Sequence, residues 1–313
     1  MKKIHYLFSV LVLISISFAA CNKTPEIDDS MLDGEKIFDP SLYDSAKYLV
    51  SIRIENPTTA QINMPVLIAA HGYSATTFEW DDFRAYSDTK GGILISQVLL
   101  GGHGRTYDDF KNASWSDWQA SIMDEYNALR KKGYNNISFV GSSTACPLMI
   151  DLIENNRIDA NSMRHILMVD PIIAPSDKML TLVGVLGPML GYLETNMSEE
   201  EEGHWYHFRP QETLKELLKL IDKTRKDLEN TVYLPSGVHV KIYKSIHDPT
   251  ADAISALMIY KGLFNRDGSH IDVEMLESNI HVVTRLNGRE HVSQNDRDTQ
   301  KHVFDDMYLI LTK

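Results

Sequence analysis

The chain has 313 residues, of which 43% are hydrophobic, and it carries a formal net charge of −12. This length allows one large α/β domain or two small ones, with enough apolar residues for a substantial core. The negative charge argues against a nucleic-acid partner and against binding to an anionic membrane surface by charge alone.

The N-terminus has the pattern of a secretion signal. Two lysines precede an apolar run over residues 7–16, and Ala19 and Ala20 lead directly to Cys21. This run is short for a membrane span, and a cysteine after two small residues is typical of a lipoprotein cleavage site. We therefore expect a lipoprotein signal peptide over residues 1–20, with a plain secretory signal as the alternative.

Lipidation of Cys21 would anchor the chain stably to a membrane of the bacterial cell envelope, on the periplasmic face or at the cell surface. The only other cysteine is Cys146, so no intramolecular disulfide is then possible. Residues 21–44 are polar and acidic and contain two prolines, which predicts a flexible tether before a folded domain over residues 45–313.

The sequence of the first half of the domain predicts strands that end in glycine turns. Residues 47–55 alternate as in a strand, and residues 65–70 and 93–100 are apolar runs typical of buried parallel strands. His71-Gly72-Tyr73 follows the second of these, and Gly102-His103-Gly104 follows the third. Because the carboxyl ends of parallel strands form the functional edge, we expect the Tyr73 amide to help bind an oxyanion. The alternative is a simple glycine turn.

A capped helix comes next. Ser114 and Asp117 have the spacing of a short capping box, and Gly133 is placed to end the helix. Trp115 and Trp118 share the apolar face, so we expect both to pack in the core or line a groove.

The residues around Ser143 form the most informative motif. An apolar, β-leaning run over residues 137–140 stops at Gly141, and a helical pattern covers residues 147–153. A strand, sharp turn and helix in this order need small residues two before and two after the apex, where Gly141 and Ala145 stand. The spacing G-x-S-x-A is that of a nucleophile elbow, which exposes a serine hydroxyl at a helix N-terminus. An ordinary βα turn is the alternative.

The chain from about residue 47 to the C-terminus resembles the α/β-hydrolase superfamily, nearest its bacterial carboxylesterase and monoacylglycerol-lipase members. The resemblance depends on the ordered motifs His71-Gly72-Tyr73, Gly102-His103-Gly104 with the following Trp115-x-x-Trp118, and Gly141-Ser142-Ser143-Thr144-Ala145. It implies a mostly parallel central sheet flanked by helices, with a small helical cap over the active site. These relatives usually have Met-Gly-Gly after the serine, where this chain has Thr144-Ala145-Cys146.

The second half contains a long insertion between strands at 165–169 and 238–243. It far exceeds an ordinary crossover, and we interpret residues 175–235 as the cap. Its Met- and Leu-rich opening, residues 179–193, either lines an acyl pocket or packs on the sheet. A helix from about Pro210 has an apolar face of Leu214, Leu217, Leu218 and Ile221.

An acid and a base each follow a late strand. Asp248 follows the strand over residues 238–243, and His291 follows a last strand expected over residues 280–284. The order Ser, Asp, His is that of the α/β-hydrolase triad. We therefore predict Ser143, Asp248 and His291 as catalytic residues. Asp170, which also ends a strand, is the alternative acid, and His281 is set aside because it falls within the expected strand.

The predicted chemistry is acyl transfer through a serine ester. Ser143 attacks an ester carbonyl, His291 moves protons, and the amides of Tyr73 and Thr144 stabilise the oxyanion. The expected substrates are short or medium acyl esters or monoacylglycerol-like lipids, and no cofactor or metal is implied. The alternatives are an inactive binding lipoprotein with this fold and an amidase or acyltransferase that uses the same triad.

Overall fold

The computed structural model describes residues 24–28, 31–34, 44–176 and 191–313. The expected signal peptide, Cys21 and most of the Met- and Leu-rich stretch at 179–193 lie outside these residues. Within the described residues, no helix is both long enough and apolar enough to cross a membrane.

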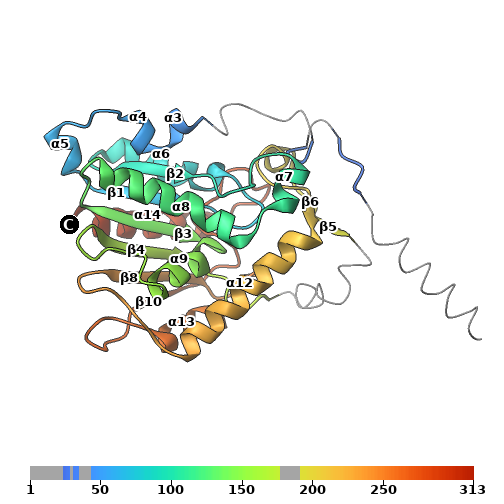
Figure 1. Cartoon of the computed structure of the whole chain (residues 1–313). Helices are drawn as coiled ribbons and strands as arrows, with labels where there is room; N and C mark the ends of the chain where they lie inside the picture. Colours follow the sequence, from blue (N-terminus) through green and yellow to red (C-terminus); the bar gives the residue numbers. More distant parts are fainter. Residues whose placement is uncertain (1–23, 29–30, 35–43, 177–190) are drawn as a thin grey trace, which may run out of the picture.

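A six-stranded parallel sheet forms the centre of the molecule, in the order β10-β8-β4-β3-β1-β2 (Figure 1). Its strands are β1 (Val66–Ala70), β2 (Leu94–Val98), β3 (Ile137–Ser142), β4 (Met163–Val169), β8 (His239–Ser245) and β10 (Asp272–Leu276). Two short pairs lie outside it: β5 (Tyr192–Glu194) with β6 (Phe208–Pro210), and β7 (Val232–Tyr233) with β9 (Leu263–Phe264).

Helices cover both faces of the sheet. One face carries α8 (Trp115–Lys131), α9 (Ala145–Glu154), α12 (Gln211–Glu229) and α13 (Ile254–Gly262), and the other carries α6 (Asp81–Lys90) and α14 (Gln294–Thr312) (Figure 1). The described residues also contain short helices: α3 (Ser45–Tyr48), α4 (Val50–Arg53), α5 (Thr59–Ile62), the 3₁₀ helix η2 (Thr77–Trp80), α7 (Tyr107–Asn112) and α11 (Glu199–Glu202).

Alternation along β1 explains why both faces are apolar. Val66, Ile68 and Ala70 pack into the core under α8 and α9, whereas Leu67 and Ala69 pack into the core under α6 and α14. Successive side chains of a strand point to opposite faces, so a strand covered on both sides reads as one continuous apolar run. The apolar run at residues 65–70 is therefore confirmed as a central strand.

The predicted features of α8 are confirmed. Ser114 and Asp117 form a reciprocal capping box, Trp118 is fully buried, and Gly133 adopts a φ of 93° after the helix. The predicted helix from about Pro210 is α12, which buries Leu214 and Leu217 among other apolar residues.

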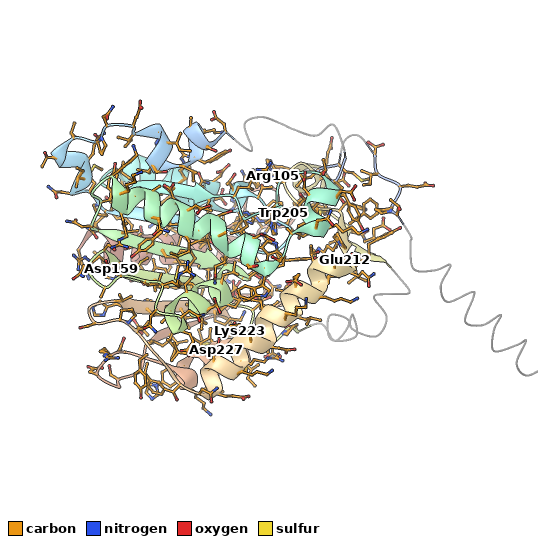
Figure 2. All side chains as sticks on the ribbon, viewed as in Figure 1. Arg105, Asp159, Trp205, Glu212, Lys223 and Asp227 are labelled. Carbon is orange, nitrogen blue, oxygen red and sulfur yellow. The ribbon has the colours of Figure 1, made fainter. Side chains whose placement is uncertain are left out.

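Helix α12 lies in the insertion between β4 and β8 and packs against α9. Lys223 of α12 lies 2.7 Å from both Asp151 of α9 and Asp227 one turn further along α12. Figure 2 shows Lys223 and Asp227 on this helix and Glu212 nearer its N-terminus. These ion pairs supplement the apolar contact that fixes α12 beside the elbow helix.

The strand expected over residues 47–55 is wrong, because these residues form α3 and α4. The backbone amides of Val50 and Ser51 donate to side chains, Ser96 Oγ at 2.9 Å and Glu125 Oε1 at 3.2 Å. These buried acceptors satisfy the amides that a ladder would otherwise pair, so short helical turns dock on the edge of the sheet.

The last strand was also placed wrongly. Residues 280–284 are irregular, and the final strand is β10, an edge strand whose residues are mostly exposed or half-buried. Edge strands often carry charged residues, as Asp272 and Glu274 do here, so β10 lacks the apolar run that marks a central strand.

Part of the expected tether packs on the domain. Leu32 is fully buried, and its amide donates to the Glu202 carbonyl at 3.1 Å. Both oxygens of the Asp33 carboxylate accept backbone amides, from His207 at 3.1 Å and Phe208 at 2.6 Å. Residues 31–34 therefore differ from a free tether.

Candidate active site

Ser143 stands at the apex of a sharp turn between β3 and α9. Its φ is 49°, in the left-handed region that residues other than glycine adopt at strained, often functional positions. A Cβ on Gly141 would lie 2.8 Å from Phe139 and 2.9 Å from the Ala145 Cβ, too close for any side chain without movement. The requirement for small residues on both sides of the serine is thus borne out, and the turn has the geometry of a nucleophile elbow.

Gly72 brings a second loop against the serine. A Cβ on Gly72 would lie 3.1 Å from the Ser143 Cβ, so only glycine allows this approach without displacement. The amides of Tyr73 and Thr144 have no hydrogen-bond acceptor among the residues that the structure describes. Both residues line the same cavity as Ser143, so these amides are suitable donors to a developing oxyanion.

His71 holds the Gly72 loop in place. Its Nε2 accepts the Leu100 amide at 3.0 Å, so its Nδ1 carries the proton and donates to the Gly72 carbonyl at 2.8 Å. Burial lowers the pKa of His71 to about 4, which keeps the ring neutral at pH 7. The role of His71 is therefore to fix the loop that carries the Tyr73 amide.

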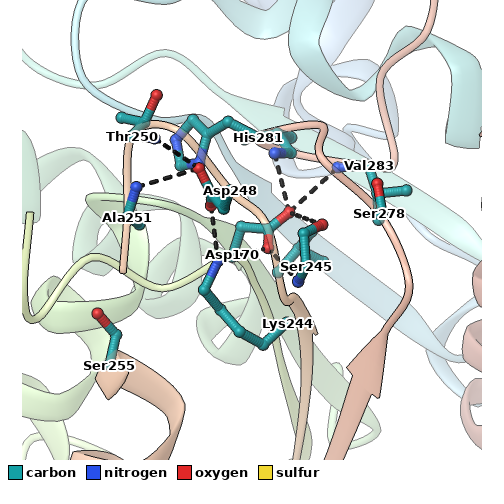
Figure 3. Close-up of polar contacts among 12 residues, drawn as sticks. Asp170, Lys244, Ser245, Asp248, Thr250, Ala251, Ser255, Ser278, His281 and Val283 are labelled. Atoms are coloured by element: carbon teal, nitrogen blue, oxygen red, sulfur yellow. Dashed lines mark hydrogen bonds and ion pairs between the residues drawn. The ribbon is translucent and has the colours of Figure 1, made fainter. Parts of the chain in front are cut away.

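The structure brings His281, not His291, to Asp248. His281 Nδ1 lies 2.8 Å from Asp248 Oδ2 (Figure 3). His281 also lines the cavity that contains Ser143. His291 is exposed and lines a different surface hollow, together with His247 and Glu277. The expectation for His291 is corrected to His281, which follows the true last strand, β10.

Asp248 is ionised and firmly held. Its Oδ1 accepts the Thr250 and Ala251 amides at 2.8 and 3.1 Å, and Lys244 Nζ lies 2.6 Å from its Oδ2. Burial alone would raise the pKa of Asp248, but His281 and Lys244 together outweigh burial and hold this pKa well below its usual range. With Nδ1–H donated to Asp248, the Nε2 of His281 is left to accept a proton.

No hydrogen bond joins Ser143 Oγ to His281 among the described residues. Such contacts are often long without bound substrate and tighten when the reaction complex forms.

Asp170, the alternative acid, orients the loop of His281 instead. It is fully buried, and its Oδ2 accepts the amides of Val282 and Val283 at 2.9 and 3.2 Å (Figure 3). Val282 has a φ of 59°, which is strained for a β-branched residue, and the Asp170 carboxylate stabilises that conformation. Asp170 does not contact the His281 ring through any hydrogen bond in the described residues.

Lys244 links the two aspartates. Its side chain is fully buried, and Nζ lies 3.0 Å from Asp170 Oδ1 as well as close to Asp248. Asp170, Asp248 and His281 place ligand atoms within 4.8 Å of one another, as a metal site would. The ammonium of Lys244 already supplies the positive charge that these carboxylates need, so the donor set fits an internal ion-pair network better than a metal.

The cavity in front of Ser143 has a volume of about 570 Å³. Leucines and a tryptophan from the insertion between β4 and β8 form part of its wall, including Leu193, Leu214, Leu217 and Trp205. Trp205 is labelled in Figure 2. Three arginines and three glutamates also line it, which the sequence patterns did not indicate.

Curated proteins and solved structures were found that resemble this chain in sequence or in fold. No family model matches the chain. The chain is similar to a carboxylesterase of Bacillus subtilis (strain 168), with 25% identity over 76% of this chain and 93% of the relative. It is also similar to a thermostable monoacylglycerol lipase of Bacillus sp. (strain H-257), with 24% identity over 71% and 85% of the two chains.

Two solved structures resemble the fold. One, from work on the metagenome-derived lipolytic enzymes LipS and LipT, has a TM-score of 0.62 at 18% identity and covers 79% of this chain and 93% of its own. A monoglyceride lipase from Saccharomyces cerevisiae has a TM-score of 0.59 at 10% identity and covers 79% and 86%. The chain has the α/β-hydrolase fold. The predicted central parallel sheet with helices on both faces is therefore confirmed.

Proposed function

We propose that this α/β-hydrolase cleaves carboxylic esters through an acyl-enzyme on Ser143. The observation that carries the proposal is that His281, paired with Asp248, lines the same cavity as the strained elbow serine. The named activities of the two Bacillus relatives, a carboxylesterase and a monoacylglycerol lipase, support ester hydrolysis.

In the proposed mechanism, Ser143 Oγ attacks the ester carbonyl while His281 Nε2 takes the hydroxyl proton. Asp248 holds the imidazole in the Nδ1–H tautomer and stabilises the imidazolium that forms. The amides of Tyr73 and Thr144 donate to the oxyanion, and loss of one such donor costs about 3 kcal/mol of transition-state stabilisation.

His281 then gives the proton to the leaving alcohol, which departs and leaves the acyl group on Ser143. A water enters, loses a proton to His281 and attacks the acyl carbonyl, and Ser143 recovers its proton as the acid leaves. Protons balance over the cycle, and no cofactor takes part in any step.

The test is ester hydrolysis by the full chain in detergent, across 4-nitrophenyl esters of increasing acyl length and monoacylglycerols. We expect turnover by the wild type on short to medium acyl chains and none by Ser143→Ala with unchanged folding. Equal rates from both proteins, or no turnover of any ester, would reject the proposal and favour a binding lipoprotein.

We also propose that the chain is a lipoprotein anchored through Cys21 in the bacterial cell envelope. The support is the sequence alone: two lysines, an apolar run and two alanines before that cysteine. Metabolic labelling with a fatty acid tests this, and wild-type protein that takes up no more label than Cys21→Ala would reject it.

A further inference from the structure

The cavity of Ser143 is lined by three arginines and three glutamates, but these charges are not all paired with one another. The carboxylates of Glu79, Glu194 and Glu201 all have partners within the described protein. Glu79 accepts the Gly72 amide and the Ser142 hydroxyl. Glu194 lies 2.9 Å from an imidazole nitrogen of His207, and Glu201 lies 2.7 Å from Arg285. Among the described residues, only Glu201 forms an ion pair with an arginine of the cavity, Arg285, and no carboxylate lies within ion-pair distance of Arg209 or Arg289.

Arg209, on β6, has no such partner. Its side chain makes no hydrogen bond to the described residues, and its Nε is buried without an acceptor. Its guanidinium lies 6.0 Å from the centre of the Tyr73 ring, so it is close to the loop whose amide faces the oxyanion position. A guanidinium held partly out of water with unfilled donors is costly unless an anion completes it.

Arg289 contributes a second guanidinium that forms no direct ion pair with the described residues. Its Nε donates to the Arg285 carbonyl at 2.8 Å, and another of its N–H groups donates to the His281 carbonyl. Both acceptors are neutral, and no carboxylate pairs with it among the described residues. Burial, together with the neighbouring Arg285, lowers the pKa of Arg289 to about 10, so it remains a cation at pH 7.

We infer that the ester substrate carries an anionic group, a carboxylate or a phosphate, which binds to Arg209 and Arg289 in the cavity of Ser143. This inference rests on the proposed ester hydrolysis and narrows its substrate class. Guanidinium groups bind both anions through paired, charge-assisted hydrogen bonds, which are the strongest class of hydrogen bond in proteins. An anion here would accept hydrogen bonds from the N–H groups of Arg209 and hold the ester in a fixed position relative to Ser143.

Two matched pairs of esters test the inference and distinguish the two anions. The first compares mono(4-nitrophenyl) glutarate with 4-nitrophenyl pentanoate, which share a five-carbon acyl chain and differ in a terminal carboxylate. The second compares 1-butyrylglycerol 3-phosphate with 1-butyrylglycerol, which differ in a phosphate on the alcohol. At constant ionic strength and pH 7, we expect kcat/KM for the anionic member of at least one pair to be roughly tenfold higher or more.

Arg209→Gln should reduce that ratio of anionic to neutral kcat/KM to about 1 or below. Because the two esters of a pair report on the same protein sample, the ratio is insensitive to partial unfolding of the variant. Arg266→Gln, which removes an exposed arginine from a surface turn, is the matched control and should leave the ratio unchanged. A preference for the neutral ester in both pairs, or a ratio that Arg209→Gln does not change, would overturn the inference.

A failure of the esterase itself gives a different pattern, in which none of the four esters is cleaved. The anion site is then tested by calorimetry with glutarate and with glycerol 3-phosphate. Binding of either anion that Arg209→Gln weakens tenfold or more supports the site, and binding of neither would overturn it.

Discussion

Replacement of Lys244 by methionine removes the buried charge that joins Asp170 and Asp248. The two carboxylates are fully buried, and their facing oxygens lie within 4.8 Å of each other. At an effective dielectric constant of about 20, their repulsion is about 3.5 kcal/mol once the ammonium is gone. This agrees with the loss of about 3–5 kcal/mol that follows removal of one partner from a buried ion pair.

Urea unfolding at pH 7.5 and 4.5 measures the effect of Lys244→Met. Without the ammonium, one carboxylate takes a folded-state pKa above its unfolded value, so its contribution to stability is complete at low pH and is lost as pH rises through that pKa. We therefore expect a deficit of about 3–5 kcal/mol at pH 7.5 that is smaller at pH 4.5. Esterase kcat should fall at least tenfold, because a protonated Asp248 no longer stabilises the imidazolium of His281.

Lys241→Met is the matched control on the same strand. Lys241 is partly exposed and pairs with Glu274 at 3.0 Å and with Asp306 at 2.5 Å, so solvent screens these pairs and its loss should cost about 1 kcal/mol. A Lys244→Met deficit below 1 kcal/mol at pH 7.5, or one that grows toward pH 4.5, would refute the reasoning about the buried network.

Three further predictions concern the loops around the serine. Gly141→Ala forces a Cβ to within 2.9 Å of Phe139 and Ala145, so denaturant unfolding should show a loss of about 1–3 kcal/mol. Asp170→Asn removes the carboxylate that accepts two amides of the His281 loop, so kcat should fall at least tenfold in a steady-state assay. An unchanged kcat would show that the loop keeps its conformation without this carboxylate. The folded-state pKa of His71 is about 4, below its unfolded value, so its contribution to stability is complete above pH 6.5 and is lost as pH falls. Between pH 7 and 5 this loss is about 2 kcal/mol, and His71→Gln should flatten the corresponding part of the stability curve against pH.

The elbow turn and the position of Asp248 after a strand could be predicted because local chemistry defines them. A sharp turn admits only small neighbours, which Gly141 and Ala145 provide, and Asp248 directly follows a strand with a clear apolar pattern. The capping box at Ser114 is equally local, since its hydrogen bonds span only three residues.

The histidine could not be found in the same way, because tertiary contacts decide its position. His281-Val282-Val283 has the β-branched content of a strand, yet the Asp170 carboxylate, more than one hundred residues earlier, accepts both valine amides and holds an irregular loop. A useful signal was present in residues 272–276, where a charged segment alternates like an exposed edge strand. Had β10 been recognised, His281 would have been the first histidine after the last strand.

The charged lining of the cavity could not be predicted from the sequence either. Arg209 and Arg289 are 80 residues apart, and neither stands in a motif. Only the packing of the β5–β6 pair and the His281 loop around the elbow brings them to one cavity.

The most direct test of the proposed site is the rate at which a fluorophosphonate labels Ser143, compared between His281→Ala and His291→Ala. Intact-mass and peptide analysis should show one label on Ser143 in the wild type and in His291→Ala, at similar rates. His281→Ala should react at least a thousandfold more slowly, because its serine lacks the base that takes the hydroxyl proton. Fast labelling of His281→Ala together with slow labelling of His291→Ala would contradict the assignment and restore His291 as the base.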